Sequence, residues 1–257
     1  ELTQGVYDDA IRHSITKMSH LHFTATSEYK NRVIQLGEDP NRVFNVGGLG
    51  IDNINKINLL SKEDFEKSIN FKLNKRNLLV TFHPVTLGKR SSCLEFQELL
   101  DAIETLENTN IILTKANADT DGRVINDMID AYVEKNKDKT IAFTSMGQLR
   151  YLSSLQFVDA VVGNSSSGLL EAPSFKIFTI NIGNRQEGRI KADSVIDCEA
   201  NKTSILESIS EIYTNENKNK LEKIVNPYGC GGASVKIKNV IKSFNLEHIL
   251  NKSFYNL

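Results

Sequence analysis

The stretch from Gly163 to Ser174, GNSSSGLLEAPS, holds the residues whose types and spacing best suit chemistry. It follows an apolar run that reads as a short buried strand, and it opens a predicted helix. Backbone N–H groups at the helix start, the helix dipole and the hydroxyls of Ser165, Ser166 and Ser167 form a candidate anion site. Glu171 could accept hydrogen bonds from sugar hydroxyls. An ordinary serine-capped helix explains the same residues equally well.

Two further segments carry side chains suited to phosphate. His83 follows a predicted strand and precedes Pro84, and a histidine stiffened in this way can bind a phosphate or protonate a leaving group. Arg185 and Arg189 lie in a glycine-flanked loop after a later strand, and guanidinium groups beside an anion site suit phosphate binding. A loop-capping histidine and a solvated loop are the alternatives.

Three other residues are weaker candidates. Asp8 and Asp9 offer carboxylates for acid–base work, although as bare sequence they are better explained as acids at a helix start. Tyr151 lies on the predicted helix before the central strand, where its ring could stack on a base. An aromatic residue at such a place more often belongs to the core.

The elements that must position these residues alternate along the chain. Short strands alternating with helices indicate a parallel, doubly wound α/β sheet, in which ligands bind at the carboxyl ends of strands. Neither a GxGxxG nor a Walker A sequence is present, which argues against a dinucleotide enzyme or a P-loop NTPase. The predicted strands are 22–26, 42–46, 78–82, 111–114, 141–144, 160–162, 177–182 and 194–197. The predicted helices lie within 1–20 and at 27–36, 60–71, 94–106, 123–133, 148–155, 204–213 and 235–244.

Composition limits the classes of partner. A chain of 257 residues with 40% hydrophobic and 25% charged residues can build one large or two smaller domains. Its net charge of −1 gives no electrostatic case for a nucleic acid or an anionic membrane as partner. Cys93, Cys198 and Cys230 are widely spaced and odd in number. They indicate reduced thiols of a cytoplasmic protein, with neither a disulfide framework nor a metal site.

Five motifs occur in one order along nearly the whole chain, and together they resemble the UDP-N-acetylglucosamine 2-epimerases, in particular the hydrolysing branch of the sialic-acid pathway. The motifs are DDAIRHSITK at 8–17, HPVT at 83–86, GNSSSG at 163–168, GNRQEGR at 183–189 and NPYG at 226–229. The resemblance implies two Rossmann-like parallel sheets of the glycosyltransferase-B type, with a UDP-sugar in the cleft.

The resemblance also implies a reaction and roles for named residues. UDP would leave by anti elimination to a glycal, and water would then add to give an N-acetylmannosamine-type sugar, without a cofactor. Asp8 matches a catalytic carboxylate for proton transfer at C2, and His83 matches the histidine near the diphosphate. The implied UDP-binding residues are Ser165, Ser166 and Ser167 of the turn, Glu171 at the ribose, Tyr151 beside the uracil, and Arg185 and Arg189 of the loop.

Three glycines in the four residues 47–50 favour flexible or unusual backbone and predict a domain boundary or hinge there. Residues 1–46 would be a remnant of the amino-terminal domain, which is only partly present, and residues 47–257 a complete UDP-binding domain. Because upstream catalytic residues of the family are missing, this chain should bind UDP and turn over little substrate. A homodimer or homotetramer is expected. The alternatives are a UDP-sugar glycosyltransferase of the same fold and a UDP-binding module without turnover.

Overall fold

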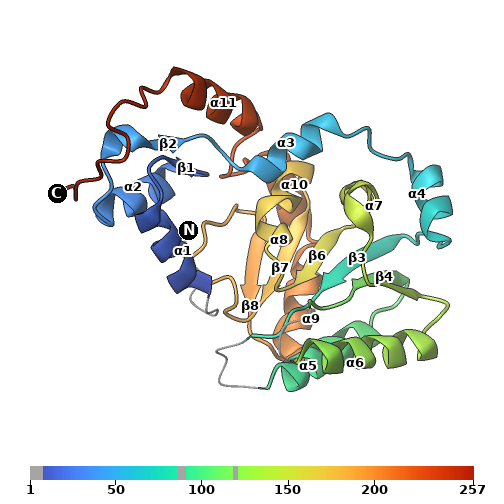
Figure 1. Ribbon diagram of the computed structural model, residues 1–257. Coiled ribbons are helices and arrows are strands. Elements are labelled where there is room, and N and C mark those ends of the chain that lie inside the picture. The colour runs from blue at the N-terminus through green and yellow to red at the C-terminus, as the bar shows by residue number, and fades with distance from the viewer. Residues whose placement is uncertain (1–7, 86–90, 118–120) are drawn as a thin grey trace.

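The protein contains a large and a small parallel sheet (Figure 1). The computed structural model describes residues 8–85, 91–117 and 121–257. The strands are β1 (His22–Thr24), β2 (Val43–Asn45), β3 (Arg76–Thr81), β4 (Thr109–Thr114), β5 (Thr140–Phe143), β6 (Ala160–Gly163), β7 (Phe178–Ile182) and β8 (Val195–Cys198). Strands of the large sheet lie in the order β5-β4-β3-β6-β7-β8, and the small sheet pairs β1 with β2.

Helices cover both faces of the large sheet, as Figure 1 shows. The α-helices are α1 (Asp8–Met18), α2 (Ser27–Gln35), α3 (Leu49–Lys56), α4 (Lys62–Ile69), α5 (Ser92–Glu104), α6 (Gly122–Lys135), α7 (Gly147–Ser154), α8 (Ser167–Leu170), α9 (Lys202–Glu211), α10 (Asn215–Glu222) and α11 (Ala233–Ser243). The described residues also form the 3₁₀ turns η1 (Pro40–Arg42) and η2 (Ala172–Phe175).

The strands are buried on both faces, as near-continuous apolar runs require in a parallel sheet. On one face, Leu78 and Val80 of β3 pack with apolar residues of α5, α6 and α9. On the other face, Leu79 joins Phe65 of α4 and Leu152 of α7 in a second cluster. The register aligns Thr81 with Thr114 of β4 and with Gly163 of β6, so these three strands end at the same level.

The order in which strands join the large sheet reverses between β3 and β6. From β3 it adds β4 and β5 on one side, and it then returns to place β6 on the other side of β3. Such a switch point opens a crevice at the carboxyl ends of the two strands, because the connections leave on opposite faces. The residues after β3 and β6, which include His83 and the serine turn, therefore meet there.

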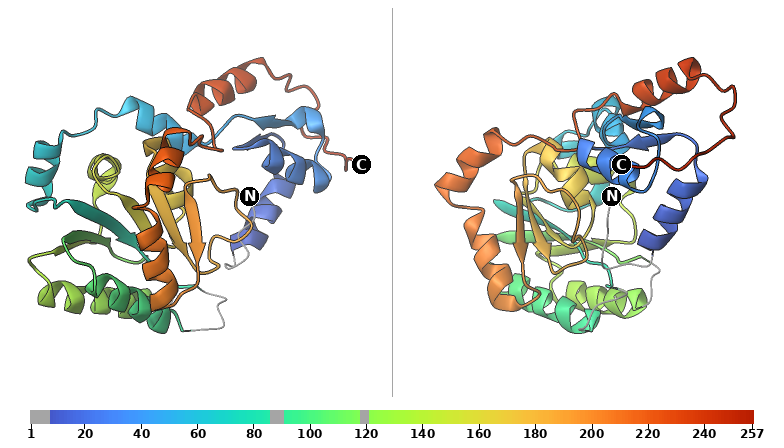
Figure 2. Two further views of the ribbon diagram at one scale, coloured as in Figure 1. Left: turned by 180° about the vertical axis from the view of Figure 1, so that it is seen from behind. Right: turned by 90° about the vertical axis from the view of Figure 1, so that its left-hand side faces the viewer.

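The carboxyl-terminal segment returns to the small sheet. Figure 2 shows the chain after α11 running back beside α2 and β2. The Arg42 guanidinium donates to the carbonyls of Ile249 and Asn251, at 3.1 Å each. The Tyr255 N–H donates to the Gly37 carbonyl at 2.9 Å. The small sheet, the helices beside it and the carboxyl-terminal segment, together called the small unit, thus contain the first and the last parts of the chain. The domain division at residue 47 stays a prediction.

The predicted parallel α/β fold is confirmed, and all eight predicted strands are present with ends shifted by a few residues. Two helices were not predicted. Helix α3 begins at Leu49, within the glycine segment predicted to be a hinge, with Gly48 as its cap and Gly50 in its first turn. Helix α10 has the sequence NENKNKLE, which lacks an apolar period. Among the described residues, no helix is both long and apolar enough to cross a membrane.

Candidate functional site

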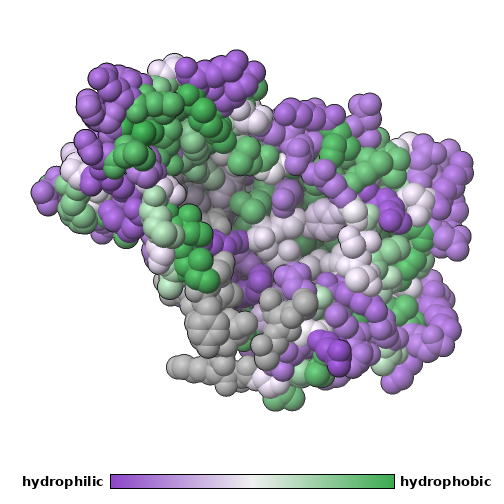
Figure 3. All heavy atoms as spheres, viewed as in Figure 1, coloured by the Kyte–Doolittle hydropathy of each residue, from purple (hydrophilic) through white to green (hydrophobic). Residues whose placement is uncertain are grey.

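A cavity of about 350 Å³ lies at the switch point, where β3, β4 and β6 end. Figure 3 shows a hollow on this face, between the small unit and the large one, with mostly polar or intermediate walls. The cavity is lined by Thr81, His83, Thr114, Lys115, Asn117, Ser145, Met146, Gly147, Gln148, Tyr151, Ser165 and Ser167. Four of the residues predicted for the site, His83, Tyr151, Ser165 and Ser167, therefore line one cavity.

Asn164 holds His83 in place at this cavity. Its side-chain carbonyl accepts from the His83 N–H at 2.7 Å, and its amide donates to the His83 carbonyl at 2.8 Å. The Asn164 N–H in turn donates to the Thr81 carbonyl at 3.1 Å. The side chain thus extends the β3–β6 ladder past its last residue. Asn164 lies within the predicted turn, but the sequence predicts no role of its own for this side chain.

The imidazole of His83 is buried and has a defined tautomer. Its Nδ1 accepts a hydrogen bond from the Asn117 N–H at 3.3 Å, and the residue is 9% exposed. Because an accepting nitrogen carries no proton, the neutral ring holds its hydrogen on Nε2. His83 can therefore donate a hydrogen bond or a proton from Nε2, as the prediction of a phosphate-binding or leaving-group histidine requires.

The serine turn is a tight backbone passage. Gly163 has a φ of +130°, and a Cβ there would lie 2.0 Å from the Thr81 carbonyl oxygen, so only glycine fits. The Ser165 Oγ accepts from the Ser167 N–H at 3.4 Å. The predicted helix is short, because α8 has one turn before η2, and Pro173 lacks the N–H that a longer α-helix would need. An anion here would depend more on local N–H and hydroxyl groups than on a helix dipole.

Glu171 presents a buried carboxylate oxygen. Within the described residues, its Oε2 is buried and has no hydrogen-bond partner. Burial raises the pKa of Glu171, against the opposing effect of a hydrogen bond from Ser167. A buried acceptor without a partner is costly unless a ligand supplies a donor. The hydroxyl groups of a sugar are donors of the required kind.

Tyr151 is tied to the serine turn. Its hydroxyl is hydrogen-bonded to the Ser167 Oγ, and its ring packs against the cluster that contains Leu152 and Val161. Burial raises the Tyr151 pKa far above its ordinary value of 10.0, so the hydroxyl stays protonated. The sequence left open whether Tyr151 is a core residue or a site residue, and the structure shows both, since the ring packs in the core and the residue also lines the cavity.

The arginine loop reaches the turn through Asn164. The Arg185 guanidinium donates to the Asn164 carbonyl at 3.2 Å. Gln186, which is fully buried, donates to the same carbonyl at 2.7 Å and accepts from the Arg189 guanidinium at 2.8 Å. Both predicted arginines are thus linked to the backbone that carries the serines. Gln186 was not predicted, since its type alone gives no signal.

Two predicted residues are not brought into this arrangement. Asp8 is the first residue of α1, but its side chain lies outside the described residues. Ser166 precedes α8 as its cap and does not line the cavity. Among the described residues, no group of three or more histidine, cysteine, aspartate and glutamate side chains is placed to hold a metal ion.

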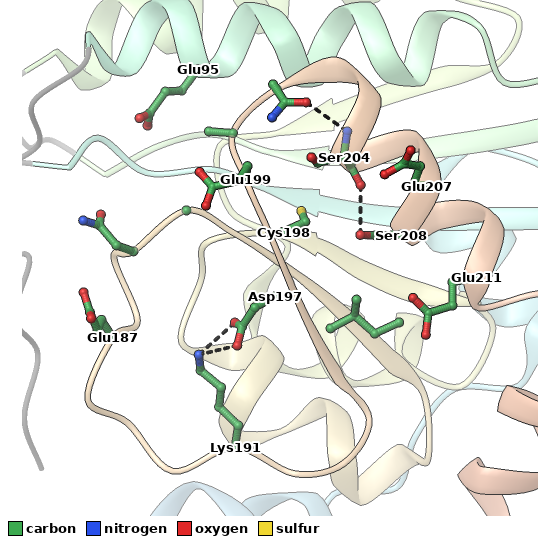
Figure 4. A pocket seen from close by; sticks show the side chains of 15 residues that line it. Glu95, Glu187, Lys191, Asp197, Cys198, Glu199, Ser204, Glu207, Ser208 and Glu211 are labelled. Carbon is green, nitrogen blue, oxygen red and sulfur yellow. Dashed lines mark hydrogen bonds and ion pairs between the residues drawn. The ribbon is translucent and has the colours of Figure 1, made fainter.

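A larger cavity of about 1030 Å³ lies along the edge strand β8 (Figure 4). Six of its lining residues are acidic: Glu95, Glu187, Asp197, Glu199, Glu207 and Glu211. Lys191 also lines it, and its ammonium group contacts both Asp197 oxygens at 2.8 Å. An excess of carboxylates repels a diphosphate. The smaller cavity at the switch point is therefore the candidate site.

Comparison with known proteins gives consistent matches. The family model described as UDP-N-acetylglucosamine 2-epimerase matches residues 1–242. The GDP/UDP-N,N'-diacetylbacillosamine 2-epimerase (hydrolyzing) of Campylobacter jejuni is 44% identical over 258 residues, which cover 100% of this chain and 67% of that protein. Polysialic acid biosynthesis protein P7 of Escherichia coli is 40% identical over 262 residues, which cover 100% of this chain and 66% of that protein. The chain spans about two thirds of the length of these curated relatives.

A solved structure shares the fold. The S. aureus MnaA–UDP co-structure superposes with a TM-score of 0.73 at 18% sequence identity, covering 99% of this chain and 68% of that one. The likeness confirms the predicted glycosyltransferase-B type of fold.

Proposed function

Because the chain belongs to the UDP-N-acetylglucosamine 2-epimerase family, we propose that it is the UDP-binding part of a hydrolysing UDP-sugar 2-epimerase. The observation that carries the proposal is the switch-point cavity. There a backbone-clamped histidine lies beside a serine turn, and a nearby carboxylate oxygen is buried without a partner.

The site offers contacts for the diphosphate and for the ribose of UDP. The diphosphate would lie against the turn, where the Ser165 hydroxyl and the Nε2–H of His83 are donors. The guanidinium groups of Arg185 and Arg189, held beside the turn, would add positive charge. The ribose hydroxyls would donate to Glu171.

The proposed reaction has two steps. A base removes the proton from C2 of the sugar while the C1–oxygen bond to UDP breaks, and the two electrons of the C2–H bond form the C1–C2 double bond of a glycal. Water then adds its oxygen to C1, and C2 gains a proton on the opposite face. The release of UDP requires that negative charge on the leaving diphosphate be stabilised. His83 can do so by hydrogen bonding, and Asp8 is the proposed group for proton transfer at C2.

The substrate is proposed to be a UDP-2-acetamido sugar that feeds the synthesis of a sialic-acid-type sugar. The names of the two curated relatives support this class, since one acts on a UDP-linked diacetamido sugar and the other serves polysialic acid biosynthesis. UDP-N-acetylglucosamine and a diacetamido analogue both fit the proposed UDP contacts.

A single assay tests the function. The intact natural protein is incubated with UDP-N-acetylglucosamine or its diacetamido analogue, without an acceptor, and products are followed by NMR. We expect free UDP together with the 2-epimeric sugar. A glycosyltransferase would leave the substrate nearly unchanged. A binding module would bind UDP but would set no UDP free from the UDP-sugar. Either result would refute the proposal.

Assembly and compartment belong to the same proposal. The protein is proposed to form a homodimer or homotetramer, which light scattering of the intact protein would measure. A cytoplasmic location is supported by the free thiols of Cys93, Cys198 and Cys230. A monomer at micromolar concentration would contradict the proposed assembly.

A further inference from the structure

Two buried tyrosines from distant parts of the chain enclose the peptide groups of Ile190. The Ile190 N–H donates to the Tyr29 hydroxyl at 3.1 Å, and the Tyr228 hydroxyl donates to the Ile190 carbonyl at 2.9 Å. The two hydroxyls are 3.0 Å apart. Tyr29 is 3% and Tyr228 1% exposed, so water does not compete for these bonds.

The donors and acceptors of this ring are fixed. Tyr29 accepts from Ile190, so its own hydrogen is left to donate to Tyr228, whose hydrogen goes to the Ile190 carbonyl. Each hydroxyl therefore both donates and accepts, and each polar group of the Ile190 peptide unit is paired. Hydrogen bonds arranged head to tail strengthen one another in a buried setting.

The ring holds one side of Arg189, and a neighbouring contact holds the other. The Arg32 guanidinium donates to the Gly188 carbonyl at 3.2 Å. Tyr29 and Arg32 both belong to α2, so one helix of the small unit fixes the backbone before and after Arg189. Tyr228 also connects to the small unit's border, since its carbonyl accepts from the Gly48 N–H at 2.8 Å.

We infer that Tyr29 and Tyr228 are positioning residues that place Arg189 for the diphosphate of a UDP-sugar. The inference rests on the proposed function, and it adds that the small unit sets the geometry of the phosphate site in the large unit. A loop anchored only at its own sheet would leave the guanidinium group to search among rotamers, and this search would weaken binding.

A double-mutant cycle in the intact natural protein tests this role. UDP affinity is measured by calorimetry for wild type, Tyr29→Phe, Tyr228→Phe, Arg189→Ala and the Tyr29→Phe/Arg189→Ala pair, at a temperature where all are folded. We expect each Phe variant to bind UDP roughly five- to tenfold more weakly, the usual size of one lost hydrogen bond. In the Arg189→Ala background, Tyr29→Phe should have no further effect.

Tyr213→Phe is the matched control. It also removes a partly buried tyrosine hydroxyl, which donates to Asp159 at 3.3 Å; Tyr213 lies in the turn after α9, and Asp159 directly precedes β6 at the end opposite the serine turn. It should leave UDP affinity unchanged.

If Tyr29→Phe weakens binding equally with and without Arg189, the tyrosines are merely structural and the inference is overturned. If the wild type binds UDP and the Phe variants bind it with the same affinity, the inference is also overturned, but the proposed function stands. Wild-type protein without UDP affinity would refute both.

Discussion

At the residue scale, the Glu171 carboxylate should favour UDP binding but lower the stability of the folded protein. Its Oε2 is buried without a partner among the described residues, and burial raises its pKa. The folded state therefore binds this proton more tightly than the unfolded state does. By linkage, the free energy of unfolding falls as the pH rises from the ordinary value of 4.5 through the raised pKa.

Glu171→Gln should separate the two effects. The neutral amide removes the buried charge, so the variant should be more stable than wild type at pH 7 by about 1 kcal/mol, the lower end of the cost of an unpaired buried group. Its stability should also depend less on pH above 4.5. UDP affinity should fall about tenfold, because an amide accepts ribose hydroxyls less well than a carboxylate. Denaturation at several pH values and calorimetry would measure both, and a destabilised variant with full affinity would contradict the argument.

Asn164 offers a second test at this scale. Both atoms of its amide bond the backbone of His83, and the side chain is 1% exposed. Asn164→Asp keeps the shape and the acceptor but replaces the donor by an oxygen that faces the His83 carbonyl. We expect a loss of about 2–3 kcal/mol in the free energy of unfolding. UDP release from substrate should also fall, since His83 is displaced. Urea denaturation and the UDP-release assay check the two parts, and a neutral Asp variant would show that the clamp is unimportant.

At the element scale, the passage from β6 into the turn depends on Gly163. Gly163→Ala places a Cβ 2.0 Å from the Thr81 carbonyl oxygen at a φ of +130°, so the β3–β6 pairing must shift. Gly183→Ala is a matched control, because its φ is +70° and a Cβ would meet nothing within 4 Å. The control should cost about 1 kcal/mol for backbone strain alone. Gly163→Ala should cost about 3 kcal/mol or more, as overpacking adds to strain. Equal losses in thermal denaturation would contradict the structure.

The same strands show what a sequence can predict. Apolar runs such as 78–82 and 177–182 mark buried parallel strands, because such strands have no polar face. Their alternation with helices predicts the sheet, and the residues after each strand predict the site. The turn at Gly163 to Ser167 and the histidine at 83 were found in this way.

The contacts between side chains and backbone could not be predicted. The Asn164 clamp depends on which strand lies beside β3, and the sheet order follows from tertiary packing rather than from local pattern. Gln186 and Tyr29 are ordinary residues by type, and only their positions in space connect them to the arginine loop. Helix α3 was missed because three glycines in four residues suggest a break, although a helix can begin on a glycine cap.

At the scale of the whole molecule, the two ends of the chain meet at Glu38. This carboxylate is 1% exposed and contacts Lys17 and His22 at 2.7 Å and Lys252 at 2.8 Å. Burial would raise its pKa, but the hydrogen bonds from Lys17, Lys252 and His22 together hold the pKa below the ordinary value of 4.5. The Lys252 ammonium also donates to the carbonyls of Thr16, Lys17 and Ser19. One buried anion thus joins the carboxyl-terminal segment to α1 and β1.

Acid should loosen this junction in two steps. Burial lowers the pKa of His22 below 6.5, so on acidification the unfolded chain takes up a proton there before the folded chain does. Stability should fall first below pH 6.5, and again below 4.5, where Glu38 resists protonation in the folded state. His22→Gln should remove the first step and keep the second. Equilibrium unfolding of the intact wild type and of His22→Gln between pH 4 and 8 measures both, and a stability difference between the two proteins that does not change below pH 6.5 would contradict the argument.

Lys252→Met tests the junction from the other end of the chain. The variant keeps most of the length of the side chain but removes one cation from a buried carboxylate, a change that costs about 3 kcal/mol when a charge is left underpaired. Because Lys252 lies in the segment that packs on α1, hydrogen exchange should quicken in residues 16–24 and leave β3 and β6 unchanged. Lys220→Met is a suitable control, since its contact with Glu216 is on an exposed helix surface at 3.6 Å. Quickened exchange across the large sheet would instead show that the segment stabilises the whole molecule, with no separate junction at Glu38.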